Sequence, residues 1–94
     1  MASCRQLAPP ATVSIVVPCY NEADRLNFAA FERFLRQHER FRFLFVDDGS
    51  RDNTGELLES FAARCGERVA VLRLGTNGGK GEAVRRGLQY ALSD

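Results

Sequence analysis

The chain has 94 residues, which is enough for one small domain with a modest hydrophobic core but short for a complete α/β enzyme. Hydrophobic residues make up 45% of it and charged residues 27%, as in ordinary globular proteins, and the formal net charge of +1 provides no basic surface for nucleic acid. No apolar stretch approaches the roughly 18 residues of a membrane span, so any membrane association would require parts outside this sequence.

The first 11 residues are predicted to form a flexible leader (1–11) before a domain that spans residues 12–94. They contain Pro9-Pro10 and lack the apolar core of a signal peptide. The chain has three cysteines, Cys4, Cys19 and Cys65. Because this number is odd and the spacing suits no metal, we predict reduced thiols in a cytoplasmic protein and no disulfide framework.

The first strand is predicted over residues 13–17, a β-branched run that Pro18 ends because proline lacks an amide donor. A helix follows late, with Asn27 as its N-cap. Its buried face has the i, i+3, i+4, i+7 spacing of Phe31, Phe34, Leu35 and His38. At the end of this helix, His38 is predicted to be a cap or a partly buried structural residue and not a ligand. Residues 19–27 are therefore predicted to form a loop at the end of the strand.

Two more pairs of strand and helix follow, with strands predicted over residues 41–46 and 69–74. The middle helix is predicted to be capped within residues 52–54 and to stop at Gly66. The last helix begins near the glycine-rich residues 77–81. It is predicted to bury Val84, Gly87, Leu88 and Ala91, and its small residues would let it approach the sheet closely.

The three apolar runs begin at residues 13, 41 and 69, which are 28 residues apart. This period predicts successive βαβ units with parallel strands and right-handed crossovers. The fold class is therefore α/β, a three-layer Rossmann-like half sheet in the order βαβαβα. One edge of so small a sheet would be unpaired, which predicts a fragment of a longer chain and a homodimer formed through that edge.

A polar cluster follows each strand, and parallel strands would bring all three clusters to one edge of the sheet. Asp47 and Asp48 follow the second strand, where side-chain alternation directs one carboxylate into the site and the other away from it. The carboxylate in the site could accept N–H groups of a nucleobase or sugar, or hold a cation. Helix capping is the alternative role. We assign capping to Asp52 and Thr54, and ligand contact to Asp48.

In the first cluster, Tyr20 offers a ring on which a base could stack, Glu22 can accept hydroxyl groups, and Pro18 shapes the turn. An ordinary surface loop is an equally good interpretation of this cluster by itself. The third cluster, residues 77–81 with Lys80, is equally compatible with a phosphate cradle at a helix N-terminus and with a flexible turn. It fits neither a Walker A loop nor a dinucleotide fingerprint.

Together, Val-Pro-x-Tyr-Asn-Glu, Val-Asp-Asp-Gly-Ser-x-Asp-x-Thr and Asn-x-Gly-Lys-Gly resemble the start of a family 2 glycosyltransferase with the GT-A fold, over roughly residues 12–92. Within that family, the motifs are most similar to those of polyprenyl (dolichyl) phosphate sugar transferases. The resemblance implies the N-terminal half of a GT-A fold. It places six residues at a nucleotide pocket: Pro18, Tyr20, Glu22, Asp47, Asp48 and Lys80. Asp48 would bind the base, Asp47 would support the loop, and Lys80 would approach the base or the diphosphate.

The resemblance further implies a parent enzyme that transfers a hexose from a UDP- or GDP-sugar to a polyprenyl phosphate or similar acceptor, at the cytoplasmic face of a membrane. A divalent cation, Mn²⁺ or Mg²⁺, is expected for the full-length enzyme. The sequence has no Asp-x-Asp and one histidine, so the metal ligands and the catalytic residues are expected outside it, and the chain alone is expected to be inactive. Two alternatives are a non-catalytic nucleotide-binding or assembly module and an aspartyl-phosphate receiver or phosphatase domain.

Overall fold

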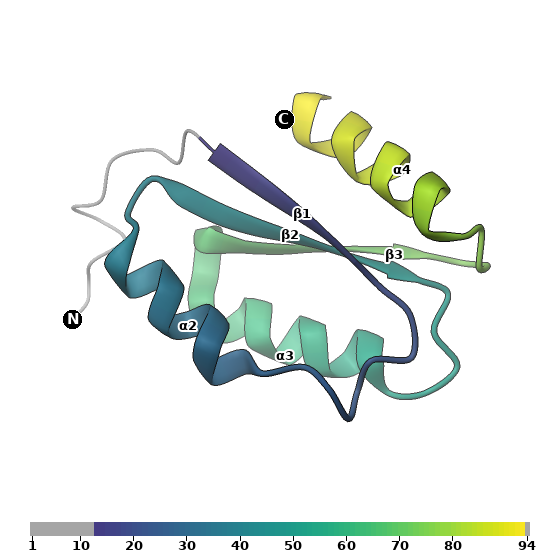
Figure 1. Ribbon diagram of the computed structural model, residues 1–94, viewed down its shortest axis with the longest axis horizontal. Helices are drawn as coiled ribbons and strands as arrows, with labels where there is room; N and C mark the ends of the chain where they lie inside the picture. The colour runs from purple at the N-terminus through teal and green to yellow at the C-terminus, as the bar shows by residue number, and fades with distance from the viewer. Residues whose placement is uncertain (1–12, 94) are drawn as a thin grey trace.

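The computed structural model describes residues 13–93 and consists of a parallel sheet between two layers of helices (Figure 1). The elements in chain order are β1 (Val13–Cys19), α2 (Phe28–Gln37), β2 (Phe41–Asp48), α3 (Thr54–Cys65), the 3₁₀ turn η1 (Gly66–Arg68), β3 (Val69–Leu74) and α4 (Lys80–Ser93). The predicted three-layer α/β order is confirmed. The predicted leader lies outside the described residues.

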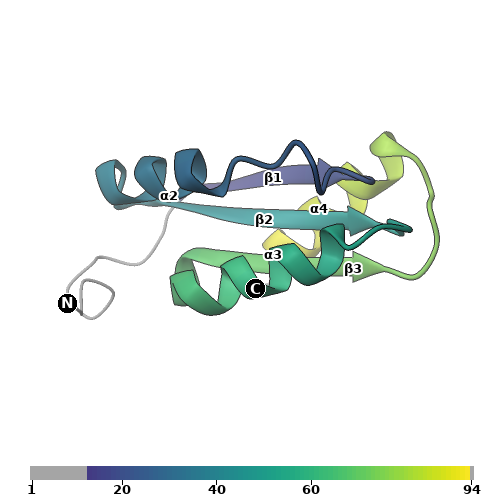
Figure 2. The same ribbon diagram turned by 90° about the horizontal axis from the view of Figure 1, so that it is seen from below.

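The sheet has the strand order β1-β2-β3, and both pairs of strands are parallel. Cys19 lies opposite Asp47 in the first pair, and Asp48 lies opposite Leu74 in the second. The carboxyl ends of all three strands are thus nearly level, and the arrowheads point to the same end of the molecule (Figure 2). The three loops that follow the strands must therefore start side by side; they are called the first (20–27), second (49–53) and third loop (75–79).

Two strands run further than predicted. β1 continues through Pro18 to Cys19, so the prediction that this proline ends the strand is wrong. An edge strand accepts proline because some of its amides point away from the sheet and need no partner within it. β2 likewise includes both Asp47 and Asp48, which are therefore held in the regular geometry of a buried central strand.

Helices α2 and α3 cover one face of the sheet with an aromatic core (Figure 1). The ring of Phe31 meets the rings of Phe43 and Phe45 edge to face, with centroids 5.0 and 5.1 Å apart. This geometry is the preferred one for aromatic pairs. Phe45 and Phe61 are fully buried. The second loop therefore begins directly after the best-buried strand of the sheet.

Helix α4 lies on the opposite face and approaches the sheet through Gly87. A Cβ atom at this position would lie 2.6 Å from Cγ1 of Val16 and 2.8 Å from Cγ2 of Val46, so the predicted close approach is confirmed. Leu88 was predicted to be buried, but it is 49% exposed. The buried line of α4 runs through residues 83, 87 and 91, and Leu88 is displaced from it by about 100° around the helix.

The ends of the helices follow local sequence signals. Asn27 caps α2 as predicted, because its side chain accepts the Ala30 amide at 3.1 Å. Gly66 ends α3 with a φ of 66°, also as predicted. His38 is the C-cap residue of α2, so its predicted capping role is confirmed, but it is exposed and not on the buried face; its ring stacks on Phe34 with centroids 4.2 Å apart. The helix ends one residue earlier, so His38 leaves its periodic position.

Replacing Gly87 by alanine tests the close packing of α4. We expect Gly87→Ala to lower the free energy of unfolding by about 1–2 kcal/mol, because overpacking costs about 1–3 kcal/mol and better helix propensity recovers at most about 1 kcal/mol. Gly81→Ala is the matched control, since apart from its chain neighbours and the backbone of its own helix no atom lies within 4 Å of its Cβ position. Urea unfolding followed by circular dichroism measures both variants. A Gly87→Ala protein as stable as the parent would contradict the packing described here.

Candidate functional site

A cavity of about 420 Å³ lies beyond the carboxyl ends of the strands. Residues from all three loops line it: Pro18, Cys19, Tyr20, Glu22, Asp48, Asn77, Gly79 and Lys80. Five of the six predicted site residues are therefore in one place, and Asp47 is the exception. Their roles toward a ligand stay predictions.

The carboxylate of Asp48 is the centre of this arrangement. It is 3% exposed and accepts three hydrogen bonds from the third loop. Oδ1 accepts the Gly78 amide at 2.9 Å, and Oδ2 accepts the Gly79 amide at 3.0 Å and the Asn77 side-chain amide at 3.1 Å. A carboxylate has about four acceptor positions, so about one is left for a ligand. Asp48 is thus a loop anchor as well as a wall of the cavity.

The turn after Asp48 lies directly against the third loop. Gly49 has a φ of 70°, and a Cβ atom there would lie 2.6 Å from the Asn77 nitrogen and 2.6 Å from the Thr76 carbonyl carbon. Both atoms belong to the backbone and cannot move aside as a side chain would. Only glycine meets both constraints, which explains its place after the aspartate pair.

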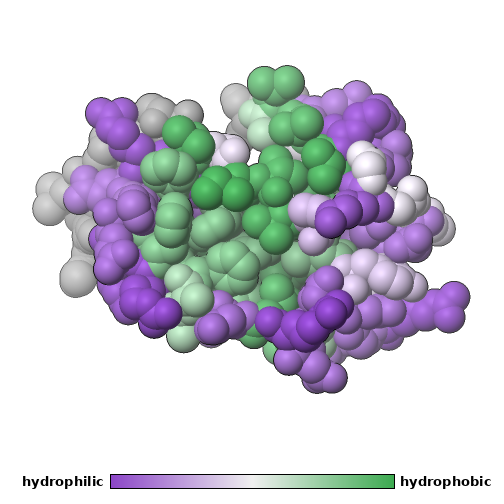
Figure 3. Space-filling model, viewed as in Figure 1, coloured by the Kyte–Doolittle hydropathy of each residue, from purple (hydrophilic) through white to green (hydrophobic). Residues whose placement is uncertain are grey.

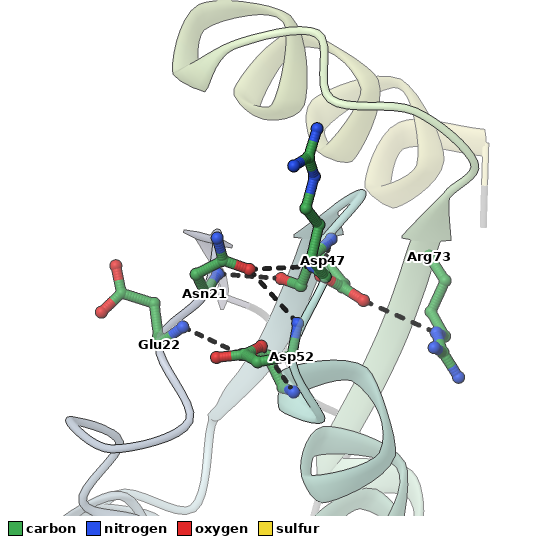
Figure 4. A network of polar contacts seen from close by, with 8 residues as sticks. Asn21, Glu22, Asp47, Asp52 and Arg73 are labelled. Carbon is green, nitrogen blue, oxygen red and sulfur yellow. Dashed lines mark hydrogen bonds and ion pairs between the residues drawn. The ribbon is translucent and has the colours of Figure 1, made fainter.

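Asp47 points away from the cavity, as strand alternation predicts for one of the pair. Its Oδ1 accepts the Ser50 amide at 3.1 Å, and its Oδ2 lies 3.6 Å from Nε of Arg73 on β3 (Figure 4). With the side chain 4% exposed, this carboxylate holds the second loop and the neighbouring strand together. Its role as a support of the loop at a nucleotide site stays a prediction.

Three of the other cavity side chains are more open than Asp48. Tyr20 is 38% exposed, so the phenol ring is accessible to solvent. Glu22 forms an ion pair of 3.0 Å with Arg25 in the same loop. Lys80 is exposed at the first residue of α4, where the helix N-terminus adds partial positive charge. The cavity is therefore lined by an aromatic ring, by carboxylates and by the positively charged N-terminus of α4 with Lys80.

The predicted capping role of Asp52 is confirmed in part. Its carboxylate accepts the amide and the hydroxyl group of Thr54, and the latter bond is the main reason why the pKa of Asp52 is lowered. The N-cap residue is Asn53, whose side chain makes no capping bond. Thr54 was also predicted to cap the helix, but it is the first residue of α3 and is fully buried. Its hydroxyl oxygen accepts the Glu22 amide at 2.9 Å. The sequence pattern revealed the cap but not this bond between loops.

Cys19 forms part of the cavity wall and was not predicted there. Burial, with the negative charges of Glu22 and Asp47, raises the pKa of its thiol to about 12. The thiol therefore stays protonated over the physiological range. Cys19 and Cys65 are both free, and Cys4 lies outside the described residues.

The described residues offer no metal site and no membrane span. Residues 13–93 contain no group of three or more His, Cys, Asp or Glu side chains that could hold a metal ion. Over the same range, each helix is too short or too polar to cross a bilayer.

An open parallel sheet with a polar cavity at its carboxyl edge, bordered by a glycine-rich helix N-terminus, places the chain among the α/β proteins with an open, twisted sheet, the class in which this edge is the usual position of a ligand site. Residues 14–94 match the family described as Glycosyl transferase family 2. The chain belongs to this family. The alternative of an aspartyl-phosphate receiver or phosphatase domain is thereby set aside.

Curated relatives agree with this family. The chain is 37% identical over 92 residues to the undecaprenyl-phosphate 4-deoxy-4-formamido-L-arabinose transferase of Pseudomonas fluorescens (strain SBW25), an alignment that covers 92% of this chain and 26% of that protein. It is 36% identical over 83 residues to glycosyltransferase GlyG of Streptococcus pneumoniae, covering 87% of this chain and 27% of GlyG. The chain thus spans about a quarter of these relatives.

A solved structure shares the fold. The mannosyltransferase PcManGT from Pyrobaculum calidifontis, in complex with GDP-Man and Mn²⁺, matches with a TM-score of 0.71 and 23% identity. The match covers 83% of this chain and 24% of PcManGT. The predicted fold, the N-terminal half of a GT-A glycosyltransferase, is confirmed.

The raised pKa of Cys19 predicts that this thiol resists alkylation. A pKa of about 12 in place of 9.0 leaves roughly a thousandfold less thiolate at pH 8, and only the thiolate reacts. We therefore expect iodoacetamide to modify Cys19 at least a thousandfold more slowly in the folded protein than in guanidinium, as measured by peptide mass spectrometry. Modification at the rate of the unfolded chain would show that Cys19 is neither buried nor neutral.

Proposed function

We propose that this chain is the nucleotide-sugar-binding part of a glycosyltransferase. The parent enzyme would transfer a hexose from a UDP- or GDP-sugar to a polyprenyl phosphate or similar acceptor, at the cytoplasmic face of a membrane. The observation that carries the proposal is the meeting of Tyr20, Asp48 and Lys80 from three loops around one cavity. Membership of family 2, the undecaprenyl-phosphate transferases among the relatives and the GDP-Man complex of PcManGT support it.

Each side chain has a task suited to its chemistry. The exposed ring of Tyr20 stacks on the base, beside Pro18, and Glu22 accepts hydroxyl groups of the sugar. The remaining acceptor position of Asp48 takes an N–H group of the base. Lys80 and the first amides of α4 attract the diphosphate. Asp47 supports the second loop from behind and does not touch the ligand.

We place the metal and the catalytic residues outside the described part of the chain. The carboxylates of residues 13–93 do not form a metal site, so they do not fit the Mn²⁺ or Mg²⁺ ion expected for the full-length enzyme. When bound elsewhere in the parent, such an ion would neutralise charge on the leaving diphosphate. We therefore propose that the chain alone binds nucleotide weakly and does not transfer sugar.

Nucleotide binding tests the proposed function. We expect calorimetric titration to give weak binding of UDP or GDP, and we expect Tyr20→Ala and Lys80→Ala each to weaken it about tenfold. Loss of base stacking or of a charge-assisted phosphate contact costs about 1–3 kcal/mol, and about 1.4 kcal/mol corresponds to a factor of ten. Arg85→Ala is the control, because Arg85 pairs with Glu82 on α4 and does not line the cavity.

Two results would contradict the proposal. The first is the absence of binding of UDP, GDP and their sugars at millimolar concentration. The second is binding that Tyr20→Ala and Lys80→Ala leave unchanged. Either result would favour the alternative of a non-catalytic assembly module. Transfer of sugar by the purified chain would instead show that the catalytic residues had been misplaced.

We also propose that the chain forms a homodimer through the outer edge of β1. Within the described residues, β1 pairs only with β2, so its other edge lacks a strand partner. Val13 on this strand is 41% exposed. Figure 3 shows apolar side chains gathered over the face that carries β1, between the more polar ends of the molecule. A second copy could cover this edge by strand pairing.

Light scattering after size exclusion tests the homodimer. We expect a dimer at high protein concentration, and we expect Val13→Lys to shift it to monomer because a charge on an edge strand opposes pairing. Ala63→Lys, at an exposed position of α3, adds the same charge elsewhere and should leave the dimer intact. Monomer at every concentration would refute the proposal.

A further inference from the structure

Asn21, near the start of the first loop, connects that loop to the second one (Figure 4). Its side-chain oxygen Oδ1 accepts the Arg51 amide at 2.8 Å and the Asp52 amide at 3.4 Å. Its own amide donates to the hydroxyl oxygen of Ser50 at 3.0 Å. One residue thus makes three hydrogen bonds to a segment about 30 residues away in the sequence.

The next two amides of the first loop continue this connection. The Glu22 amide donates to Oγ1 of Thr54 at 2.9 Å, and the Ala23 amide donates to Oδ2 of Asp52 at 3.4 Å. Thr54 is fully buried at the start of α3, so it is a rigid point of attachment. Five hydrogen bonds therefore join residues 21–23 to residues 50–54 and fix the backbone around Glu22.

The backbone of Asn21 is left-handed, with a φ of 52°. It is the only residue other than glycine with positive φ within residues 13–93. Asparagine and aspartate tolerate this conformation better than other residues with side chains. Position 21 thus requires both tolerance of positive φ and an acceptor oxygen. Glycine would meet the first requirement, alanine neither, and aspartate both.

We propose that Asn21 is a positioning residue for the nucleotide site, an inference that rests on the proposed function. Asn21 stands between Tyr20 and Glu22, which both line the cavity, while its own side chain is occupied by the second loop and does not line it. It acts through these two neighbours by fixing their direction relative to Asp48. A loop held in its binding conformation loses less entropy when a ligand binds.

A set of substitutions separates the acceptor oxygen from the backbone conformation. We expect Asn21→Gly to weaken UDP or GDP binding about tenfold, although it keeps the conformation, because it loses Oδ1. We expect Asn21→Asp to stay within about threefold of the parent, because a carboxylate accepts the same two amides. Asn21→Ala should be the weakest binder of the three.

Double mutants then show whether Asn21 acts through Tyr20. In a Tyr20→Ala background, Asn21→Gly should have a much smaller effect on affinity than in the parent, because the residue that it positions is gone. In a Lys80→Ala background its effect should remain about tenfold. Equal effects in both backgrounds, or no effect of Asn21→Gly in the parent, would overturn the proposal.

Hydrogen exchange tests the positioning without any ligand, so its outcome is separate from that of the proposed function. We expect Asn21→Gly to lower the protection of the Glu22 amide about tenfold and to leave that of Leu58, in the core of α3, unchanged. Asn21→Asp should retain the protection of both amides. Unchanged protection at Glu22 would overturn the proposal even if nucleotide binds. If the exchange results are as expected but the chain binds no nucleotide, the proposed function is refuted. Asn21 would then still be the residue that orders the first loop.

Discussion

The bonds between Asp48 and the third loop are the interaction on which the cavity depends. Parallel register places Asp48 opposite Leu74, where β3 ends, so the third loop begins beside this carboxylate. The carboxylate is buried and accepts three donors from residues 77–79. A buried charge without partners costs several kcal/mol, so the second and third loops cannot separate without that penalty. The start of α4, and with it Lys80, is placed by this contact.

Most of the fold could be predicted because it follows from local rules and from chirality. Three apolar runs with one period indicate parallel strands, and Asn27 and Gly66 end their helices by short-range chemistry. The burial of Leu88 and of His38 was mispredicted for a common reason. Periodicity identifies one side of a helix, but it does not say how much of that side a narrow sheet covers or at which residue the helix ends.

The location of the site could be predicted from the sequence, but its hydrogen bonds could not. Strand ends and polar clusters indicated where the loops meet, but no pattern said that Asp48 would be occupied by backbone amides of the third loop. The role of Asn21 was missed because it stands between Tyr20 and Glu22, which look more suited to a ligand. One local signal was available: asparagine is among the few residues that accept a left-handed backbone, which is a common feature of tight turns.

The second loop and the residues beside it contact both of the other loops, so the three loops are connected through it. Asp48 and Gly49 hold the third loop, whereas Ser50, Asp52 and Thr54 hold the first. Groups that order the start of α3 therefore also position Glu22. Because hydrogen bonding from Thr54 lowers the pKa of Asp52, ionised Asp52 favours the folded state. This contribution is present above the ordinary pKa of an aspartate and is lost as the pH falls through the lowered value. Acid would then loosen the cap of α3 and its bond to the first loop together, because the same carboxylate makes both.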